Sequence, residues 1–252
     1  MGSRARYLEF GVISDQPDLF SCEFASRKEL TVLSYGAGQE STWILYKLAI
    51  CSDFRTMFAP RRLLVIGCDT GDEHEETYDH VQYTREFCEV QGMEFHWLEW
   101  HMGFHSEAWS TLIGQYRRNN TIGSAMFGRC CTDNLKIKPF YRFLAWWLHN
   151  NYNVPYDRLH LGRTFHAFAG SHGKINVIIG FAANEAARKE KTVSSHTDAV
   201  SCVAKYRRNT VEFSFPLIDL KLDRGRPRST SGPWACHCRR PVIASVATSG
   251  GR

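Results

Sequence analysis

The chain has 252 residues, of which 43% are hydrophobic, and a formal net charge of +5 at pH 7. The hydrophobic content suffices for a packed core in one sizeable α/β domain or two small ones, and the modest charge permits an anionic ligand without demanding nucleic acid. No apolar run approaches the ~20 residues that span a bilayer, residues 1–6 lack the apolar stretch of a secretory signal, and the odd number of cysteines argues against a disulfide framework, so we expect a soluble cytoplasmic protein that binds no membrane.

Strand-like and helical patterns alternate over the first hundred residues. Apolar strand-like runs fall at 30–34, 63–68 and 93–97, and helical patterns fall at 41–50 and 75–91. This order predicts a βαβαβ arrangement, which implies an α/β fold with a parallel sheet covered by helices on both faces.

Two helices are predicted in the middle of the chain. The first covers residues 106–116 behind a Ser106 cap and is expected in the core, because its apolar residues recur at i, i+3, i+4 and i+7. The second begins near Pro139, whose fixed φ suits a first helical turn, and its apolar stripe is expected to pack inward. The apolar positions are Trp109, Leu112, Ile113 and Tyr116 in the first helix and Phe143, Leu144, Trp147 and Leu148 in the second.

The last third of the chain contains shorter elements. Residues 163–174 are interpreted as a loop, either mobile over a site or simply on the surface. A buried strand is predicted at 175–181, a short helix at 184–191, and a last strand or strand-like entry at 211–217. From about Gly225 the sequence is turn-forming and poorly periodic. We therefore expect one domain over residues 1–224 and an irregular tail over residues 225–252.

The first candidate for chemistry is the turn after the first predicted strand, Gly36-Ala37-Gly38-Gln39-Glu40-Ser41-Thr42. Closely spaced glycines between a strand and a helix let backbone N–H groups approach a phosphate, which a helix N-terminus favours. Ser34, Ser41 and Thr42 can add hydroxyl donors, and Glu40 can hold Mg²⁺ against the same phosphates. An ordinary tight turn explains these residues equally well. The P-loop of kinases and GTPases is excluded, because no Gly-Lys-Ser/Thr follows the glycines.

The second candidate is the acidic segment over residues 68–77, at the end of the second predicted strand. Ligands of an open parallel sheet gather outside the carboxyl ends of its strands, so this segment is expected beside the first turn. Its carboxylates can bind Mg²⁺ or ribose hydroxyls. Some of them are equally explained as favourable charges at a helix start.

Four motifs in order, and one further similar segment, resemble the phosphoadenosine phosphosulfate (PAPS) reductase family of the PP-loop, or adenine nucleotide alpha hydrolase-like, superfamily. The first turn resembles the Ser-Gly-Gly-x-Asp-Ser PP-loop, and Asp69-Thr70-Gly71 with Glu76-Thr77 resembles the second motif of the family. The later stretches are Arg129-Cys130-Cys131-Thr132 with Lys136-Ile137-Lys138-Pro139, Ile179-Gly180-Phe181 with Glu185 and Arg188, and the similar Pro216-Leu217-Ile218-Asp219. The resemblance covers roughly residues 30–223, and several motifs in order are more specific than any one of them.

The resemblance implies a Rossmann-like, doubly wound and mostly parallel sheet whose PP-loop binds the phosphate or sulfate end of an adenine nucleotide. The binding residues that it implies are Ser34, Gly36, Ala37, Gly38, Gln39, Ser41, Thr42, Thr70, Thr77, Glu185 and Arg188. The implied catalytic residues are Glu40, Asp69, Arg129 and Lys136, with Glu40 and Asp69 as the Mg²⁺ ligands. A guanidinium and an ammonium both neutralise phosphate, although solvated surface charge also explains Arg129 and Lys136.

Two chemistries are compatible with this resemblance. Our leading hypothesis is cleavage of ATP at the α-phosphate with Mg²⁺ to activate an unidentified acceptor, for sulfur transfer or nucleic-acid modification, because Glu40 suits the metal-assisted route. The alternative is reduction of PAPS or adenylyl sulfate, which needs a cysteine nucleophile. A nucleotide-binding module without turnover is a third hypothesis, and a plain nucleic-acid binder is weaker than these.

The remaining predictions concern cofactors and partners. Cys130 and Cys131 with Cys236 and Cys238 invite comparison with an iron–sulfur site, but the Cys-x-Cys spacing does not fit one, so no cluster is expected. The histidines form no zinc-binding spacing. The expected partners are an adenine nucleotide and an acceptor, either nucleic acid or a sulfur donor protein. The sequence is also compatible with a homo-oligomer.

Overall fold

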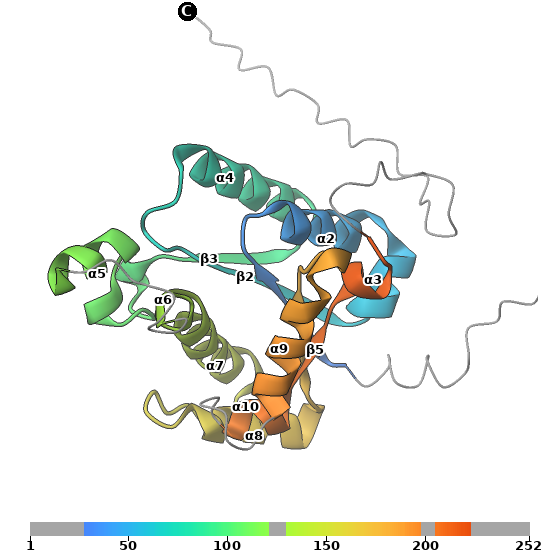
Figure 1. The fold of residues 1–252 in the computed structure, drawn as a ribbon. Coiled ribbons are helices and arrows are strands. Elements are labelled where there is room, and N and C mark those ends of the chain that lie inside the picture. The colour runs from blue at the N-terminus through green and yellow to red at the C-terminus, as the bar shows by residue number, and fades with distance from the viewer. Residues whose placement is uncertain (1–27, 121–129, 198–204, 223–252) are drawn as a thin grey trace, which may run out of the picture.

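The computed structural model describes residues 28–120, 130–197 and 205–222, and its centre is a five-stranded sheet with the strand order β3-β2-β1-β4-β5 (Figure 1). Every neighbouring pair of strands is parallel. The strands are β1 (Leu30–Tyr35), β2 (Arg62–Cys68), β3 (Glu94–Leu98), β4 (Ile175–Ile179) and β5 (Val211–Ser214). The predicted α/β class and parallel sheet are confirmed, and the arrangement is consistent with a Rossmann-like fold.

Helices connect the strands and lie on both sides of the sheet (Figure 1). The helices before β4 are α2 (Gln39–Ile50), α3 (Ser52–Phe58), α4 (Glu75–Val90), α5 (Leu112–Asn119), α6 (Cys130–Thr132), a π-helical segment (Asp133–Ile137), α7 (Lys138–Tyr152) and α8 (Leu161–His172). Those after β4 are α9 (Ala186–Thr197), α10 (Lys205–Thr210) and α11 (Pro216–Asp219).

The two faces of the sheet carry separate hydrophobic cores, because successive side chains of a strand point to opposite faces. On β1, Leu30 and Val32 pack into the core shared with α7 and α8, whereas Leu33 and Tyr35 pack into the core shared with α2, α3 and α4. The predicted apolar stripe of the helix at Pro139 is confirmed as packing, since Phe143, Leu144, Trp147 and Leu148 are all buried.

The prediction for residues 106–116 is wrong in both the start of the helix and its burial. The helix α5 begins behind Thr111, whose Oγ1 accepts a hydrogen bond from the Gly114 N–H at 2.9 Å. Ile113 is 45% exposed, and Gln115 is the buried residue of this helix. Ser106 precedes only a short 3-10 turn (Glu107–Trp109), and α5 itself begins behind a second N-cap residue, Thr111, inside the predicted range. The helix places its apolar positions outside the two cores.

The loop predicted over residues 163–174 is also wrong, because α8 occupies this part of the chain. Phe165 and Phe168, three positions apart on this helix, are fully buried in the core that the sheet shares with α7 and α8. Burial of two aromatic rings therefore outweighs the low helix propensity of the glycines and histidines around them.

Smaller corrections concern the ends of the elements. The last strand stops at Ser214, and the following residues form the short helix α11, whose Pro216 has no N–H to donate to a sheet. The helix predicted at 184–191 starts later and is longer, as α9. The predicted tail over residues 225–252 lies outside the described residues. Within the described ranges, no helix has both the length and the apolar character needed to cross a bilayer.

Candidate functional site

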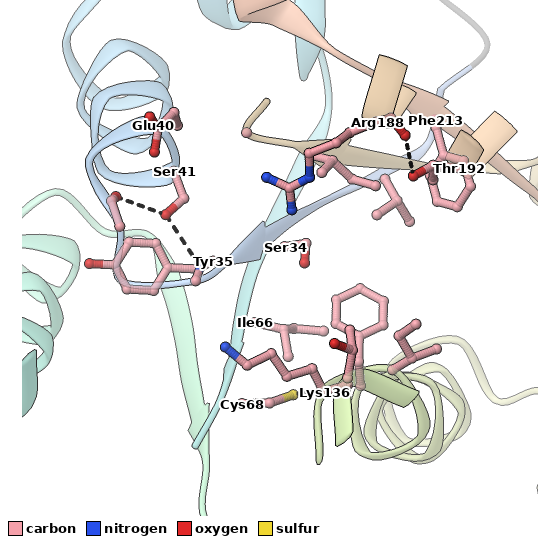
Figure 2. A pocket seen from close by; sticks show the side chains of 18 of the residues that line it. Ser34, Tyr35, Glu40, Ser41, Ile66, Cys68, Lys136, Arg188, Thr192 and Phe213 are labelled. Atoms are coloured by element: carbon pink, nitrogen blue, oxygen red, sulfur yellow. Dashed lines mark hydrogen bonds between the residues drawn. The ribbon is translucent and has the colours of Figure 1, made fainter. Parts of the chain in front are cut away.

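A cavity of about 410 Å³ opens at the carboxyl ends of β1 and β4 (Figure 2). The strands β2 and β3 lie on one side of β1, and the later strands β4 and β5 lie on its other side. The order of the strands therefore reverses between β1 and β4. Open α/β sheets bind ligands at such a switch point. The lining residues are Ser34, Tyr35, Gly36, Gly38, Glu40, Ser41, Ile66, Cys68, Thr132, Lys136, Ile137, Phe140, Tyr141, Val177, Ile179, Gly180, Glu185, Arg188, Thr192, Arg207 and Phe213.

The bend between β1 and α2 is open toward the cavity. A Cβ built on Gly36 meets no atom within 4 Å, and one on Gly38 meets a single Glu40 carboxylate oxygen at 3.7 Å. Ser41 organises the bend, because its Oγ accepts a hydrogen bond from the Gly36 N–H at 3.3 Å and donates one to the Gly38 carbonyl at 3.1 Å. Ala37 adopts a left-handed conformation with φ of 54°. The bend therefore has room for a ligand group beside its main chain.

The loop after β4 presses directly against the start of α2. A Cβ on Gly180 would lie 3.0 Å from the backbone nitrogen of Ser41 and 3.2 Å from two carbon atoms of Glu40. A residue with a side chain would push the two walls of the cavity apart. Glycine at this position thus fixes how closely the two walls approach each other.

Three cationic side chains line the cavity from three different elements. Lys136 comes from the π-helical segment, Arg188 from α9 and Arg207 from α10. Figure 2 shows the Lys136 and Arg188 side chains pointing into the cavity from opposite sides. Arg188 lies 4.5 Å over the Phe181 ring and pairs with Glu185, and Arg207 lies 4.1 Å over the Tyr141 ring. These contacts hold both guanidinium groups in place at the cavity wall.

The π-helical segment explains how one stretch of chain supplies several lining residues. Lys136 and Ile137 line the cavity from this segment, Thr132 lines it from the end of α6, and Phe140 and Tyr141 line it from the first turn of α7. A π-helical turn has an i→i+5 hydrogen-bond pattern and is frequently found at functional sites. The π-helical turn brings both the cation Lys136 and the apolar residue Ile137 to the cavity.

The part of the cavity nearest α7 is largely apolar and buried. Phe140 and Tyr141 of α7 and Val177 of β4 are buried and line this part of the cavity, and burial raises the pKa of Tyr141 to about 12. Cys68 also lines the cavity, and burial raises the pKa of its thiol to about 12. The Cys68 thiol is therefore protonated at neutral pH and is a poor nucleophile.

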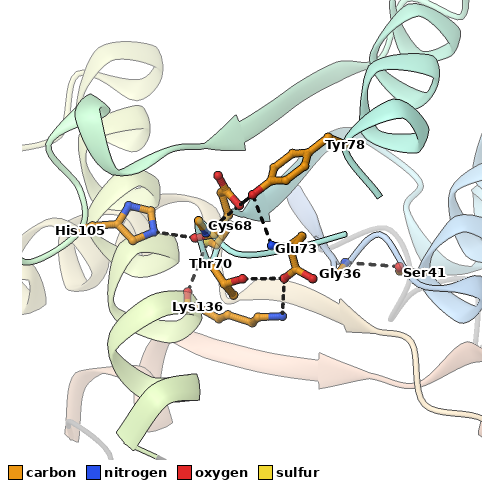
Figure 3. A network of polar contacts seen from close by, with 10 residues as sticks. Gly36, Ser41, Cys68, Thr70, Glu73, Tyr78, His105 and Lys136 are labelled. Carbon is orange, nitrogen blue, oxygen red and sulfur yellow. Dashed lines mark hydrogen bonds and ion pairs between the residues drawn. The ribbon is translucent and has the colours of Figure 1, made fainter. Parts of the chain in front are cut away.

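The acidic segment after β2 forms a network of its own (Figure 3). Asp69 Oδ1 accepts hydrogen bonds from the Gly71 N–H at 2.9 Å and the Tyr78 hydroxyl at 3.0 Å. Burial lowers the pKa of His105, so its neutral ring donates through Nε2 to the Asp69 carbonyl at 3.2 Å. Thr70 donates to Glu73 Oε1 at 2.8 Å. Asp69 and Thr70 are close to the cavity in sequence, but they shape the loop and do not line the cavity.

Several other predicted binding residues also lie off the cavity wall. The Thr42 hydroxyl bonds to the Tyr35 hydroxyl at 3.3 Å and to His80 Nε2 at 3.0 Å, between α2 and α4. Thr77 lies in the first turn of α4, where its N–H donates to the His74 carbonyl. Ala37 and Gln39 belong to the bend but are not lining residues.

The predicted residues that the structure does bring together are Ser34, Gly36, Gly38, Glu40, Ser41, Lys136, Glu185 and Arg188. Arg129, Cys236 and Cys238 and the side chain of Cys130 lie outside the described parts of the chain. The Cys131 sulfur lies 3.6 Å from the Tyr116 hydroxyl, and Cys131 is not among the residues that line the cavity. Among the described residues, no group of three or more His, Cys, Asp and Glu side chains could hold a metal ion.

Sequence reasoning missed Arg207, Tyr141 and Phe213 as lining residues. Tyr141 lies two positions after Pro139 on the helix whose aromatic residues were assigned to packing. Arg207 is one of two adjacent arginines in a short polar helix and carries no motif. Its guanidinium group reaches the cavity by lying over the ring of Tyr141 from α7.

Comparisons with models of protein families, with curated proteins and with solved structures found no match to this chain.

Proposed function

We propose that the protein is a PP-loop enzyme of the PAPS reductase-like type that binds ATP in this cavity and cleaves it at the α-phosphate to activate an acceptor. The observation that carries the proposal is the open bend at Gly36 and Gly38, which faces the cavity lined by Lys136, Arg188 and Arg207. Cations from several elements around one opening favour a ligand that carries several negative charges, as a triphosphate does.

The size and the two-sided character of the cavity support a nucleotide rather than a bare phosphate. Its volume of about 410 Å³ is in the range of small-molecule sites. The polar bend suits the phosphates, whereas Phe140, Tyr141 and Val177 form an apolar wall that suits the flat base. Ser34 and Ser41 add hydroxyl groups at the polar side.

The carboxylate of Glu40 fits a role in holding Mg²⁺ beside the phosphates. Mg²⁺ is usually bound through one or two carboxylates together with the phosphates of the substrate, so one lining carboxylate suffices. When bound, Mg²⁺ acts as a Lewis acid on phosphate oxygens. Lys136 and Arg188 stabilise the negative charge that develops during cleavage and on the departing pyrophosphate. The second Mg²⁺ ligand expected from the sequence, Asp69, stays a prediction: it does not line the cavity, and its Oδ1 accepts hydrogen bonds from the Gly71 N–H and the Tyr78 hydroxyl.

The burial of Cys68 disfavours this cysteine as the nucleophile of a sulfonucleotide reductase. A reductase needs a thiolate at the sulfur of its substrate, and the thiol of Cys68 at the cavity has a pKa of about 12. The acceptor is proposed to be a nucleic acid or a sulfur donor, as the resemblance implies.

The test is to incubate the full chain with ATP labelled at the α-phosphate and Mg²⁺, and to separate AMP, ADP and pyrophosphate. Because no acceptor is added, water attacks the α-phosphate in its place and pyrophosphate leaves, so we expect AMP and pyrophosphate in equal amounts. The Glu40→Gln variant should form AMP about 100-fold more slowly while it still binds ATP. Glu89→Gln is the matched control, because Glu89 is exposed near the end of α4 and does not line the cavity.

Three results would contradict the proposal. Release of ADP and phosphate would show cleavage at the wrong bond. Tight binding of ATP without any product would support the hypothesis of a nucleotide-binding module without turnover. Sulfite release from PAPS with thioredoxin would instead support the reductase.

A further inference from the structure

Lys136 has an anionic partner outside the cavity. Its ammonium nitrogen lies 3.8 Å from Oε1 of Glu73, which belongs to the loop between β2 and α4 (Figure 3). The same lysine lines the cavity and points toward its interior (Figure 2). One cation therefore lies within reach of both an internal carboxylate and any anion that enters.

The Glu73 carboxylate is held in place independently of Lys136. Thr70 Oγ1 donates to the same Oε1 atom at 2.8 Å, and the Glu73 N–H donates to the Tyr78 hydroxyl at 3.4 Å. Tyr78 in turn donates to Asp69 at 3.0 Å. Because the loop fixes the carboxylate, Glu73 stays behind when the flexible lysine side chain turns toward a ligand.

The contact between the two charges is long and accessible to water. The side chains of Lys136 and Glu73 are 47% and 29% exposed. An ion pair of this kind is weak and easily exchanged, whereas a polyphosphate offers the ammonium several charged oxygens. The Lys136 ammonium therefore prefers the polyphosphate to Glu73. Because the Lys136–Glu73 pair must first break, Glu73 lowers the affinity of the site for the polyphosphate by the free energy of that pair.

We propose that Glu73 is an internal competitor for the ligand anion: it holds Lys136 in the empty site and gives it up when a polyphosphate enters. This proposal rests on the proposed function for the identity of the anion as part of ATP. Glu73 is a positioning residue, since it acts on the ligand through Lys136.

A double-mutant cycle with two probes tests the proposal. The dissociation constants of ATP and of inorganic pyrophosphate are measured by titration calorimetry for the wild type, Glu73→Gln, Lys136→Met and the double variant, at constant ionic strength. We expect Glu73→Gln to tighten the binding of both probes by about 2- to 5-fold, which is the range for an exposed ion pair. In the Lys136→Met background the same change should have no such effect.

Two further variants separate competition from general electrostatics. Glu75→Gln removes the same charge two residues along, at the exposed start of α4, and should change affinity by less than Glu73→Gln. Lys136→Arg keeps the positive charge and should preserve the tightening that Glu73→Gln produces. Thermal melting of each variant confirms that it is folded.

The possible outcomes are distinct. Weaker binding by Glu73→Gln, or an equal effect with and without the Lys136 ammonium, overturns the competitor role and leaves the proposed function standing. Coupling seen with pyrophosphate in a protein that does not bind ATP supports the competitor role and contradicts the proposed function. Absence of binding for both probes overturns both.

Discussion

The close approach of the β4 loop to α2 gives a prediction for Gly180→Ala. The added Cβ would lie 3.0 Å from Ser41 N and 3.2 Å from two Glu40 atoms, where ordinary contacts begin at 3.4 Å. The neighbours are mostly backbone, so the start of α2 must move by a few tenths of an ångström. Such overpacking costs about 1–3 kcal/mol of unfolding free energy, which lowers Tm by about 2–12 °C in a domain of this size.

The movement also changes the bend that Ser41 organises, so ATP affinity should fall by about tenfold. Thermal melting and titration calorimetry measure the two effects. Gly36→Ala is the matched control: its Cβ meets no atom within 4 Å, so Tm should stay the same, but the methyl group takes up space beside the bend and ATP should bind more weakly. An unchanged Tm of Gly180→Ala would refute the close approach. Unchanged ATP affinity of Gly36→Ala would refute the position given to the phosphates.

Three other predictions follow from the contacts of Glu94, Gly67 and Arg207. Burial by itself would raise the pKa of Glu94, but hydrogen bonds from His96, Trp147 and Arg62 outweigh it and hold the pKa at about 2. Because this folded-state pKa lies below the usual 4.5, the stabilisation is present above about pH 4.5 and is lost as the pH falls toward 2. In denaturant titrations, Glu94→Gln should therefore cost about 1–2 kcal/mol at pH 7, after allowance for the side chain being 34% exposed, and little at pH 2. Gly67→Ala should lower Tm strongly, since its Cβ would lie 2.3 Å from the Trp97 ring, and an unchanged Tm would contradict this packing. Arg207→Gln should weaken ATP binding about 5- to 10-fold in calorimetry with no change in the AMP-to-ADP product ratio.

Much of the sheet was predictable because its strands are short apolar runs that follow the simplest α/β order. Leu30 to Ser34 and Leu63 to Cys68 are recognisable from composition, and both pair as expected. The helix α8 was not predictable from local signals, because Phe165 and Phe168 acquire their role only when the rest of the core meets them. Thr111 displaced the predicted Ser106 cap for a reason that spacing alone does not reveal, since both residues are good caps.

The candidate site was predictable where one contiguous segment builds it. Gly36, Gly38 and Ser41 stand together in the sequence and together in the cavity. Arg207 reaches the cavity only through tertiary packing, so no local pattern indicates it. Asp69 had the residue type and the position that a metal ligand needs, but its hydrogen bonds with Gly71 and Tyr78 became visible only in three dimensions.

A crystal structure with Mg²⁺ and a non-hydrolysable ATP analogue tests the central claim most directly. We predict phosphate oxygens about 3 Å from the backbone nitrogen of Gly38 and from Lys136 Nζ, with the base against Tyr141. A triphosphate bound elsewhere on the molecule, or an analogue that leaves the Gly36 bend without contact, would contradict it.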